Sequence, residues 1–171
     1  MAHSLILGMT ESGKTTLAKQ LAKNLKASGH PIIVLDPMHD EWAADYQTDN
    51  PDEFLKTFWA STGCHVFIDE SGDSVGRFNT LMNQTATKGR HWGHSVYFLT
   101  QRGAQLSPTV RDQCSNLFLF VSGLKDCKIH AEEWNRAELL NASNFAQGDY
   151  FHAQRHKPLT RGNIFAQING D

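Results

Sequence analysis

The sequence predicts an α/β fold with a mainly parallel sheet, helices on both faces and a C-terminal β-hairpin. Apolar strand patterns alternate with helical patterns along the chain, which is typical of parallel strands joined by helices. A glycine-rich turn joins the first expected strand to the first expected helix, and two short strand patterns flank Lys157-Pro158 near the end. With 171 residues, of which 40% are apolar and 20% charged, the chain fits one domain over residues 1–171.

The elements follow from periodicity and from residues that end helices. Leu17, Leu21 and Leu25 recur at helical spacing and Gly29 ends that helix, while Asp52 and Glu53 suit the first turn of another helix. In the first half we expect a strand over residues 3–7, a helix over 13–28, a strand over 31–35 and a helix over 51–60. In the second half we expect strands over 64–68, 94–99 and 116–121, a helix with Val75, Phe78, Leu81, Met82 and Thr85 on one face, and a hairpin of residues 148–153 and 163–166.

The composition argues against a membrane or secreted protein. No run of 18 apolar residues is present, and the N-terminus lacks the basic segment of a signal peptide, so we expect a cytosolic protein. Cys64, Cys114 and Cys127 are too far apart for a zinc motif and odd in number, so we expect buried thiols.

Charge is unevenly distributed along the chain. Residues 36–73 hold ten acids and a single Lys or Arg residue, Lys56, whereas residues 74–111 hold no acid and several bases. Two explanations stay open: like charges on separate solvated faces, or two surfaces of opposite sign that meet a neighbouring subunit or a polyanion.

Residues 8–15 match the phosphate-loop pattern G-x-x-x-x-G-K-[ST] and lie between an expected strand and an expected helix. Gly8 and Gly13 let backbone N–H groups turn toward an anion, and the helix N-terminus adds positive charge there. In this motif Lys14 reaches the β- and γ-phosphates, Thr15 is a ligand of Mg²⁺, and Thr16 lies near the α-phosphate. The alternative is a glycine-rich turn with an exposed lysine. The predicted nucleotide-binding residues are Gly8, Thr10, Glu11, Ser12, Gly13, Lys14, Thr15 and Thr16.

Two carboxylates, Asp69 and Glu70, end the apolar strand pattern Val66-Phe67-Ile68. After a phosphate loop, such an aspartate is expected to join Thr15 in holding Mg²⁺. Glu70 would point to the other side of the strand and polarise an attacking water as general base. The pair therefore predicts ATP hydrolysis, and the alternative is two solvated acids without a catalytic role.

The order of the motifs resembles the FtsK–HerA superfamily of DNA-pumping ATPases over about residues 4–121. The motifs are the phosphate loop, Val34-Leu35-Asp36-Pro37 with Glu41-Trp42, Phe67-Ile68-Asp69-Glu70, the GRHWGHS segment at 89–95, and Leu99-Thr100-Gln101-Arg102. The resemblance implies a RecA-like P-loop NTPase fold of the ASCE type. Gly103 departs from the family pattern, which has proline at this position.

The resemblance implies roles for two further residues. Gln101 would end a strand between the phosphate-loop strand and the acidic-pair strand and contact the γ-phosphate or the attacking water, which suits an amide; the alternative is a strand-end amide bonded to backbone. Arg90 resembles an arginine finger that acts on the site of a neighbouring subunit, and the alternative is a structural salt bridge. Arg102 and Arg111 are competing candidates for the finger, and Asp36 would lie beside the acidic pair without a catalytic step.

The short length of the chain favours one group within the superfamily. A motor without membrane helices or added domains is similar to the genome-packaging ATPases of tailless icosahedral viruses with an internal membrane. It implies a ring of five or six subunits that moves DNA without reading its sequence, in the host cytoplasm and at the packaging vertex of the virion, with capsid or membrane-vertex proteins as partners. The predicted DNA contacts are Arg77, Lys88, Arg155, Lys157 and Arg161, each of which is alternatively an ordinary solvated charge.

Two other functions stay open. The assembly ATPases of filamentous phages that resemble zonula occludens toxin share the motor core but normally carry a transmembrane helix. A small P-loop kinase also fits the length, although Glu70 directly after Asp69 and the lack of an arginine-rich lid segment argue against it.

Overall fold

The computed structural model describes residues 2–70, 72 and 79–169. Its centre is an eight-stranded sheet in the order β3-β2-β4-β5-β1-β6-β7-β8. Strands β3 to β6 of this order run parallel, and β7 and β8 join the edge as an antiparallel hairpin. The strands are β1 (His3–Leu7), β2 (Ile32–Leu35), β3 (Tyr46–Thr48), β4 (His65–Ile68), β5 (Ser95–Thr100), β6 (Cys114–Leu119), β7 (Asp149–Gln154) and β8 (Thr160–Asn163).

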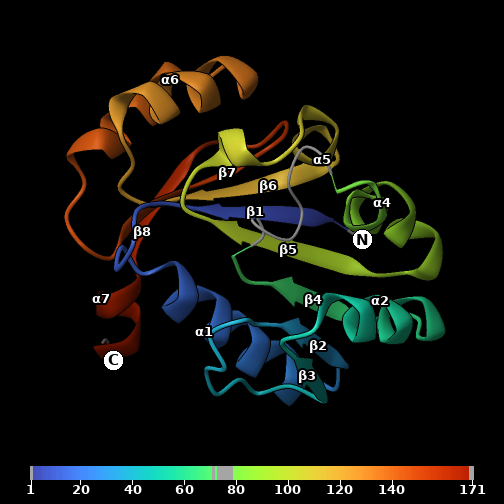
Figure 1. Ribbon diagram of the computed structural model, residues 1–171. Coiled ribbons are helices and arrows are strands. Elements are labelled where there is room, and N and C mark those ends of the chain that lie inside the picture. Colours follow the sequence, from blue (N-terminus) through green and yellow to red (C-terminus); the bar gives the residue numbers. More distant parts are fainter. Residues whose placement is uncertain (1, 71, 73–78, 170–171) are drawn as a thin grey trace.

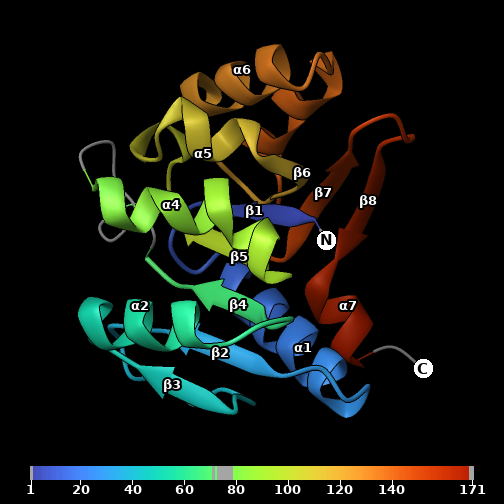
Figure 2. The same ribbon diagram turned by 90° about the vertical axis from the view of Figure 1, so that its right-hand side faces the viewer.

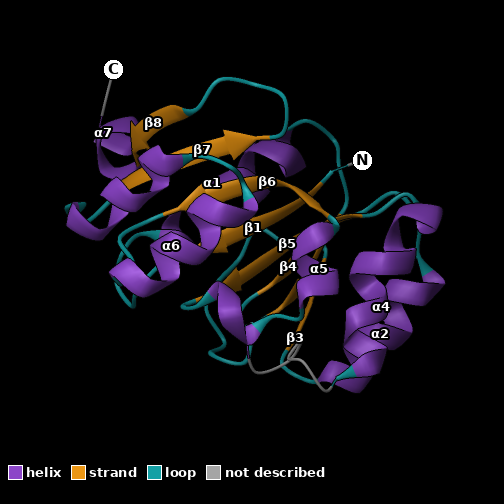
Figure 3. Ribbon diagram, turned by 90° about the horizontal axis from the view of Figure 1, so that it is seen from above, coloured by secondary structure: helices purple, strands orange, loops and turns teal. Residues whose placement is uncertain are grey.

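Helices cover both faces of the sheet, as expected (Figures 1 and 3). The α-helices are α1 (Lys14–Ala27), α2 (Pro51–Ala60), α4 (Thr80–Lys88), α5 (Pro108–Asp112), α6 (Leu124–Glu133) and α7 (Ile164–Asn169). The 3₁₀ helices in the described ranges are η1 (Gly89–Trp92), η2 (Gly103–Gln105) and η3 (Ala137–Asn144). None of the helices in the described ranges is both long and apolar enough to cross a membrane.

The core has two parts, one on each face. Phe54 and Phe58 of α2 and Met82 of α4 pack on one face together with residues of α5, α6 and η3. Leu17 of α1 and Ile164 of α7 pack on the other. Cys64, Cys114 and Cys127 are buried free thiols, as predicted.

The end of the hairpin differs from the expectation. The second arm was expected over residues 163–166, but β8 ends at Asn163 and α7 begins at Ile164. The cause is the Asn163 side chain, whose Oδ1 accepts hydrogen bonds from the N–H groups of Phe165 and Ala166, both at 3.0 Å. Asparagine in this role is a typical helix N-cap, and it turns the chain back toward α1 (Figure 2).

Candidate active site

The phosphate loop joins β1 to α1 at the C-terminal edge of the parallel strands, where ligands bind in open α/β sheets. A side chain could not replace the hydrogen of Gly8, because a Cβ there would lie 2.6 Å from Cβ of Phe120 and 2.8 Å from Oγ of Ser12. Gly13 caps α1 in the left-handed conformation with φ of 115°. The loop therefore has the compact shape that an anion cradle needs.

Lys14 lies inside this loop. Its Nζ donates to the carbonyl oxygens of Gly8 at 2.7 Å and Met9 at 3.1 Å. Burial lowers the pKa of the Lys14 ammonium, while the charges of Glu70 and Asp69 act in the opposite direction. The ammonium is thus close to both carboxylates of the acidic pair.

The acidic pair follows β4 at the same edge. Asp69 is buried, and its Oδ1 accepts a hydrogen bond of 2.9 Å from the N–H of Glu70. Burial raises the pKa of Asp69 to about 6, and the charges of Asp36 and Glu70 add to this effect. Glu70 has a left-handed backbone with φ of 51°, which turns the chain sharply after the strand. A buried, crowded carboxylate of this kind is stabilised by a nearby cation.

The oxygen atoms at this edge fit Mg²⁺. Hydroxyl and carboxylate oxygens are the ligands that Mg²⁺ takes, and Thr15 and Asp69 supply one of each beside the loop. Carboxylate oxygens of Asp36, Asp40 and Asp69 also lie within 4.8 Å of one another.

Asp36 has a structural part in this cluster. It accepts hydrogen bonds from the N–H groups of Met38 and Asp40 and from Nε1 of Trp42 at 2.8 to 3.0 Å. Trp42 is buried against Phe67, with ring centroids 5.6 Å apart. Asp36 therefore shapes the turn after β2.

Strand β5 lies between β1 and β4, the order that the family resemblance implied. The Gln101 side chain donates from Nε2 to Oγ1 of Thr10 in the phosphate loop. Arg102 points elsewhere and forms an ion pair with Asp126 of α6, with 3.3 Å between Nε and Oδ2. The two side chains, just beyond the end of β5, thus have different partners, and Arg102 stays exposed while it pairs with an acid of its own chain.

Gly103 stands where the family has proline because α6 packs against it. A Cβ at Gly103 would lie 2.4 Å from Cε1 and 2.9 Å from Nε2 of the His130 ring. Burial lowers the pKa of His130 to about 4, and the Arg111 charge adds to this effect. A neutral imidazole thus fills the space that the proline ring would need.

Arg111 is an internal residue. It is buried, it pairs with Glu133 at 3.1 Å, and its Nη1 lies 3.5 Å from the carbonyl oxygen of Gly103. Both competing finger candidates, Arg102 and Arg111, are therefore engaged in ion pairs with acids on α6.

Arg90 lies at the opposite edge of the sheet, in η1 before β5. The six residues of β5 place it about 20 Å from the phosphate loop of its own chain. Its side chain is exposed and donates from Nη2 to the carbonyl oxygen of Gln113. Arg90 therefore cannot reach the nucleotide site of its own subunit in this conformation.

The predicted DNA contacts fall into three groups. Lys88, Arg155 and Lys157 are exposed at the same edge as Arg90. Cys114 begins β6 at this edge, and the nearby charges of Arg90 and Arg155 both act to lower the pKa of its thiol. Arg161 instead pairs with Asp149 at 3.3 Å and lies over the Phe145 ring at 4.5 Å. Arg77 lies outside the described residues.

Two contacts of the phosphate loop were not foreseen. Gln147 donates from Nε2 to the carbonyl oxygen of Glu11 at 2.8 Å, and the N–H of Gly148 donates to that of Ser12 at 2.9 Å. They come from the turn before β7, more than 130 residues later in the chain. The residues around Gln147 carry no recognised motif, so topology alone reveals the contact.

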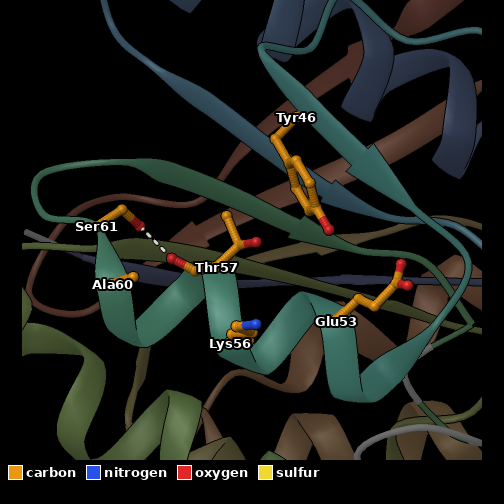
Figure 4. A pocket seen from close by; sticks show the side chains of 6 residues that line it. All are labelled: Tyr46, Glu53, Lys56, Thr57, Ala60 and Ser61. Atoms are coloured by element: carbon orange, nitrogen blue, oxygen red, sulfur yellow. Dashed lines mark hydrogen bonds between the residues drawn. The ribbon is translucent and has the colours of Figure 1, made fainter.

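A hollow away from this site lies between α2 and the edge strand β3 (Figure 4). Tyr46 of β3 faces Glu53 and Thr57 of α2 across it, and Lys56, Ala60 and Ser61 complete its lining. Of the described residues predicted to bind nucleotide or DNA, none lines it.

The family model for the central domain of helicase HerA matches residues 1–84, which contain the phosphate loop and the acidic pair. This match, over just under half of the chain, and the fold shared with solved packaging ATPases support the resemblance to the FtsK–HerA superfamily of P-loop ATPases. The family match and the RecA-like fold shared with nucleotide-bound ATPases together support ATPase activity for the chain. No curated protein sequence matches the chain.

Solved structures share this fold at low sequence identity. The genome packaging NTPase B204 from Sulfolobus turreted icosahedral virus 2, bound to AMPPCP, is 17% identical with a TM-score of 0.79, and the match covers 95% of this chain and 97% of that one. VirB4 of Thermoanaerobacter pseudethanolicus is 10% identical with a TM-score of 0.72, covering 95% and 89%. The Type VII secretion ATPase EccC of Thermomonospora curvata is 14% identical with a TM-score of 0.68, covering 95% of this chain and 25% of that one.

Proposed function

We propose that this FtsK–HerA ATPase is a nucleic-acid translocase that uses ATP hydrolysis to package a viral genome into a preformed capsid. One observation carries the proposal: the chain and the Sulfolobus virus packaging NTPase correspond over 95% and 97% of their lengths. The correspondence is less complete for VirB4, at 89% of that chain, and for EccC, at 25% of that chain.

Each residue of the site has a role in hydrolysis. Lys14 binds the β- and γ-phosphates, and Thr15 with Asp69 would hold Mg²⁺, which neutralises phosphate charge when bound. Glu70 accepts a proton from the attacking water. Gln101, already beside Thr10 of the loop, contacts the γ-phosphate or that water.

The proposed role of Arg90 requires a ring. Because Arg90 lies at the edge opposite its own phosphate loop, it would stabilise the γ-phosphoryl group bound by a neighbouring subunit. In a ring of five or six subunits, the same edge supplies Lys88, Arg155 and Lys157 to the DNA backbone. Capsid or membrane-vertex proteins would hold the ring at the packaging vertex, with assembly in the host cytoplasm.

The test is ATP turnover with no DNA, with double-stranded DNA and with single-stranded DNA. We expect double-stranded or single-stranded DNA to raise the rate of phosphate release, independently of sequence. Turnover that no DNA changes would reject the translocase and favour a second candidate, a protein-assembly or secretion ATPase, for which the fold shared with EccC is the supporting observation. Transfer of phosphate to a nucleoside instead of water would indicate a small P-loop kinase.

A further inference from the structure

A hollow of about 440 Å³ adjoins the phosphate loop. This volume lies in the range of small-molecule sites. Its lining combines the loop and the start of α1 with two residues from the C-terminal part of the chain: Glu11, Gly13, Lys14, Thr15, Thr16, Gln147 and Phe165.

The hollow lies on the nucleoside side of the loop. The γ-phosphate side is marked by Glu70 and Gln101, which follow β4 and β5. The hollow is on the other side of β1, toward β7 and β8, and includes Thr16 beside the expected α-phosphate position. The part of a nucleotide that extends beyond its α-phosphate is the ribose and the base.

Phe165 is held firmly against this hollow. Its ring packs against Gly148, where a Cβ would lie 2.5 Å from Cδ2, and its N–H donates to Oδ1 of Asn163 at 3.0 Å. Asn163 is itself fixed by a bond of 2.9 Å from Nδ2 to Oδ1 of Asp149. The ring is half-buried against the core, and its remaining surface lines the hollow. Figures 1 and 2 both show α7 beside the beginning of α1.

We infer that Phe165 is the stacking platform for the nucleobase of ATP. Phe165 is the aromatic residue among the described residues that line the hollow, and the others are polar, charged or glycine. Its ring, next to the expected α-phosphate position, therefore offers the base a flat apolar surface on which to stack. Stacking selects no single base, because every base has a π-face. Purines should bind more tightly than pyrimidines, because their rings have the larger stacking area. Gln147 is a positioning residue, because its bond to the Glu11 carbonyl holds the loop beside the ring.

This inference rests on nucleotide binding at the phosphate loop, so the experiment measures the two separately. Calorimetric titration of the full chain with ATP and with inorganic tripolyphosphate, both with Mg²⁺, distinguishes base binding from phosphate binding. For Phe165→Ala we expect the Kd of ATP to rise about 5- to 100-fold and that of tripolyphosphate to stay the same. Phe165→Tyr should keep the wild-type Kd of ATP, and Leu124→Ala, which shortens an exposed side chain on α6, is the control.

An unchanged Kd of ATP in Phe165→Ala, or an equal rise for ATP and tripolyphosphate, would overturn the inference. Failure of the wild type to bind either ligand would reject the nucleotide site itself. Since loss of the ring could unfold α7, Phe165→Trp gives a second measurement in which the platform is kept. ATP should quench the added tryptophan emission and tripolyphosphate should not, whereas equal quenching by both, or by neither, contradicts stacking.

Discussion

The two edges of the sheet differ in how far their charged side chains are exposed to solvent. At the C-terminal edge, Lys14, Asp36 and Asp69 are all at most 7% exposed. At the N-terminal edge, the side chains of Lys88, Arg90, Arg155 and Lys157 are exposed, and within the described ranges none of the four forms an ion pair.

The difference indicates that the buried edge binds a nucleotide within one chain, whereas the exposed edge is available to another molecule. Burial and close charges at the C-terminal edge favour tight binding of phosphate and a cation. At the other edge, exposed cations without an ion pair destabilise an isolated chain little, because water solvates them. They would form strong charge-assisted hydrogen bonds with an incoming phosphate.

The largest effect is expected from Arg90→Ala. If a neighbour uses this guanidinium, assembled rings should lose phosphate release by about 1,000-fold while ATP still binds. Phosphate release by the assembled protein and calorimetric titration with ATP check the two parts.

Mixing two inactive variants identifies the subunit that Arg90 serves. Arg90→Ala keeps a complete site and Glu70→Gln keeps the finger, so mixed rings should recover turnover at interfaces that combine them. A mixture that stays inactive would place Arg90 in a structural role, held by its bond to the Gln113 carbonyl.

Glu70→Gln tests the C-terminal edge by itself. Removal of the general base should slow ATP turnover by about 100-fold or more with little change in the Kd of ATP. Phosphate release and calorimetry measure both quantities, and Glu132→Gln, an exposed acid on α6, serves as the control. Wild-type turnover in Glu70→Gln would show that another group activates the water.

The nucleotide-binding motifs at the C-terminal edge were predictable from the sequence, and the partners of the arginines were not. A phosphate loop and strand-end acids occupy contiguous positions, so each motif fixes its own place at the sheet edge. Which arginine is free depends on α6, whose acids pair with Arg102 and Arg111. That helix has only a weak apolar pattern, because Asp126, Cys127 and His130 are among its buried residues.

The fold was predictable where strands contain a run of apolar residues. The sequence located five of the six parallel strands and missed β3, whose three residues at the edge carry too short a pattern. Helix α5 had a recognisable signal, Ser107 before Pro108, which is a typical N-cap followed by proline at the first helical position. The Phe165 platform depends on the Asn163 cap, which residue patterns alone do not distinguish from a strand.

His3 gives a smaller effect, on stability, at the N-terminal edge. Burial lowers its pKa to about 4, and the Arg90 charge adds to this effect. The unfolded chain binds the proton near pH 6.5, so this contribution is present above pH 6.5 and is lost as the pH falls toward 4. The loss should reach about 2 to 3 kcal/mol at pH 4.5.

Urea unfolding of the wild type and of His3→Gln from pH 7 to pH 4.5 measures this loss. The variant should be less stable at pH 7, because Nδ1 of His3 accepts from the N–H of Val96 at 3.0 Å, but its stability should fall less with acid. Parallel curves for the two proteins would mean that His3 is not kept neutral by the fold.

The smallest effect per residue is expected for DNA binding, and it is the sharpest test of the exposed edge. Lys88→Ala, Arg155→Gln and Lys157→Ala should each weaken binding of labelled double-stranded DNA a few-fold and reduce its salt dependence, by about 0.9 in log Kd against log salt for each phosphate that is no longer neutralised. Arg161→Ala is the matched control, since its guanidinium is already held by Asp149 and Phe145. Fluorescence anisotropy over a series of KCl concentrations gives the slopes. If Arg161→Ala lowers the slope as much as the other three variants, DNA does not follow the edge opposite the nucleotide. If only Lys88, Arg155 and Lys157 lower it, the DNA backbone binds the cations that form no ion pair within the described residues.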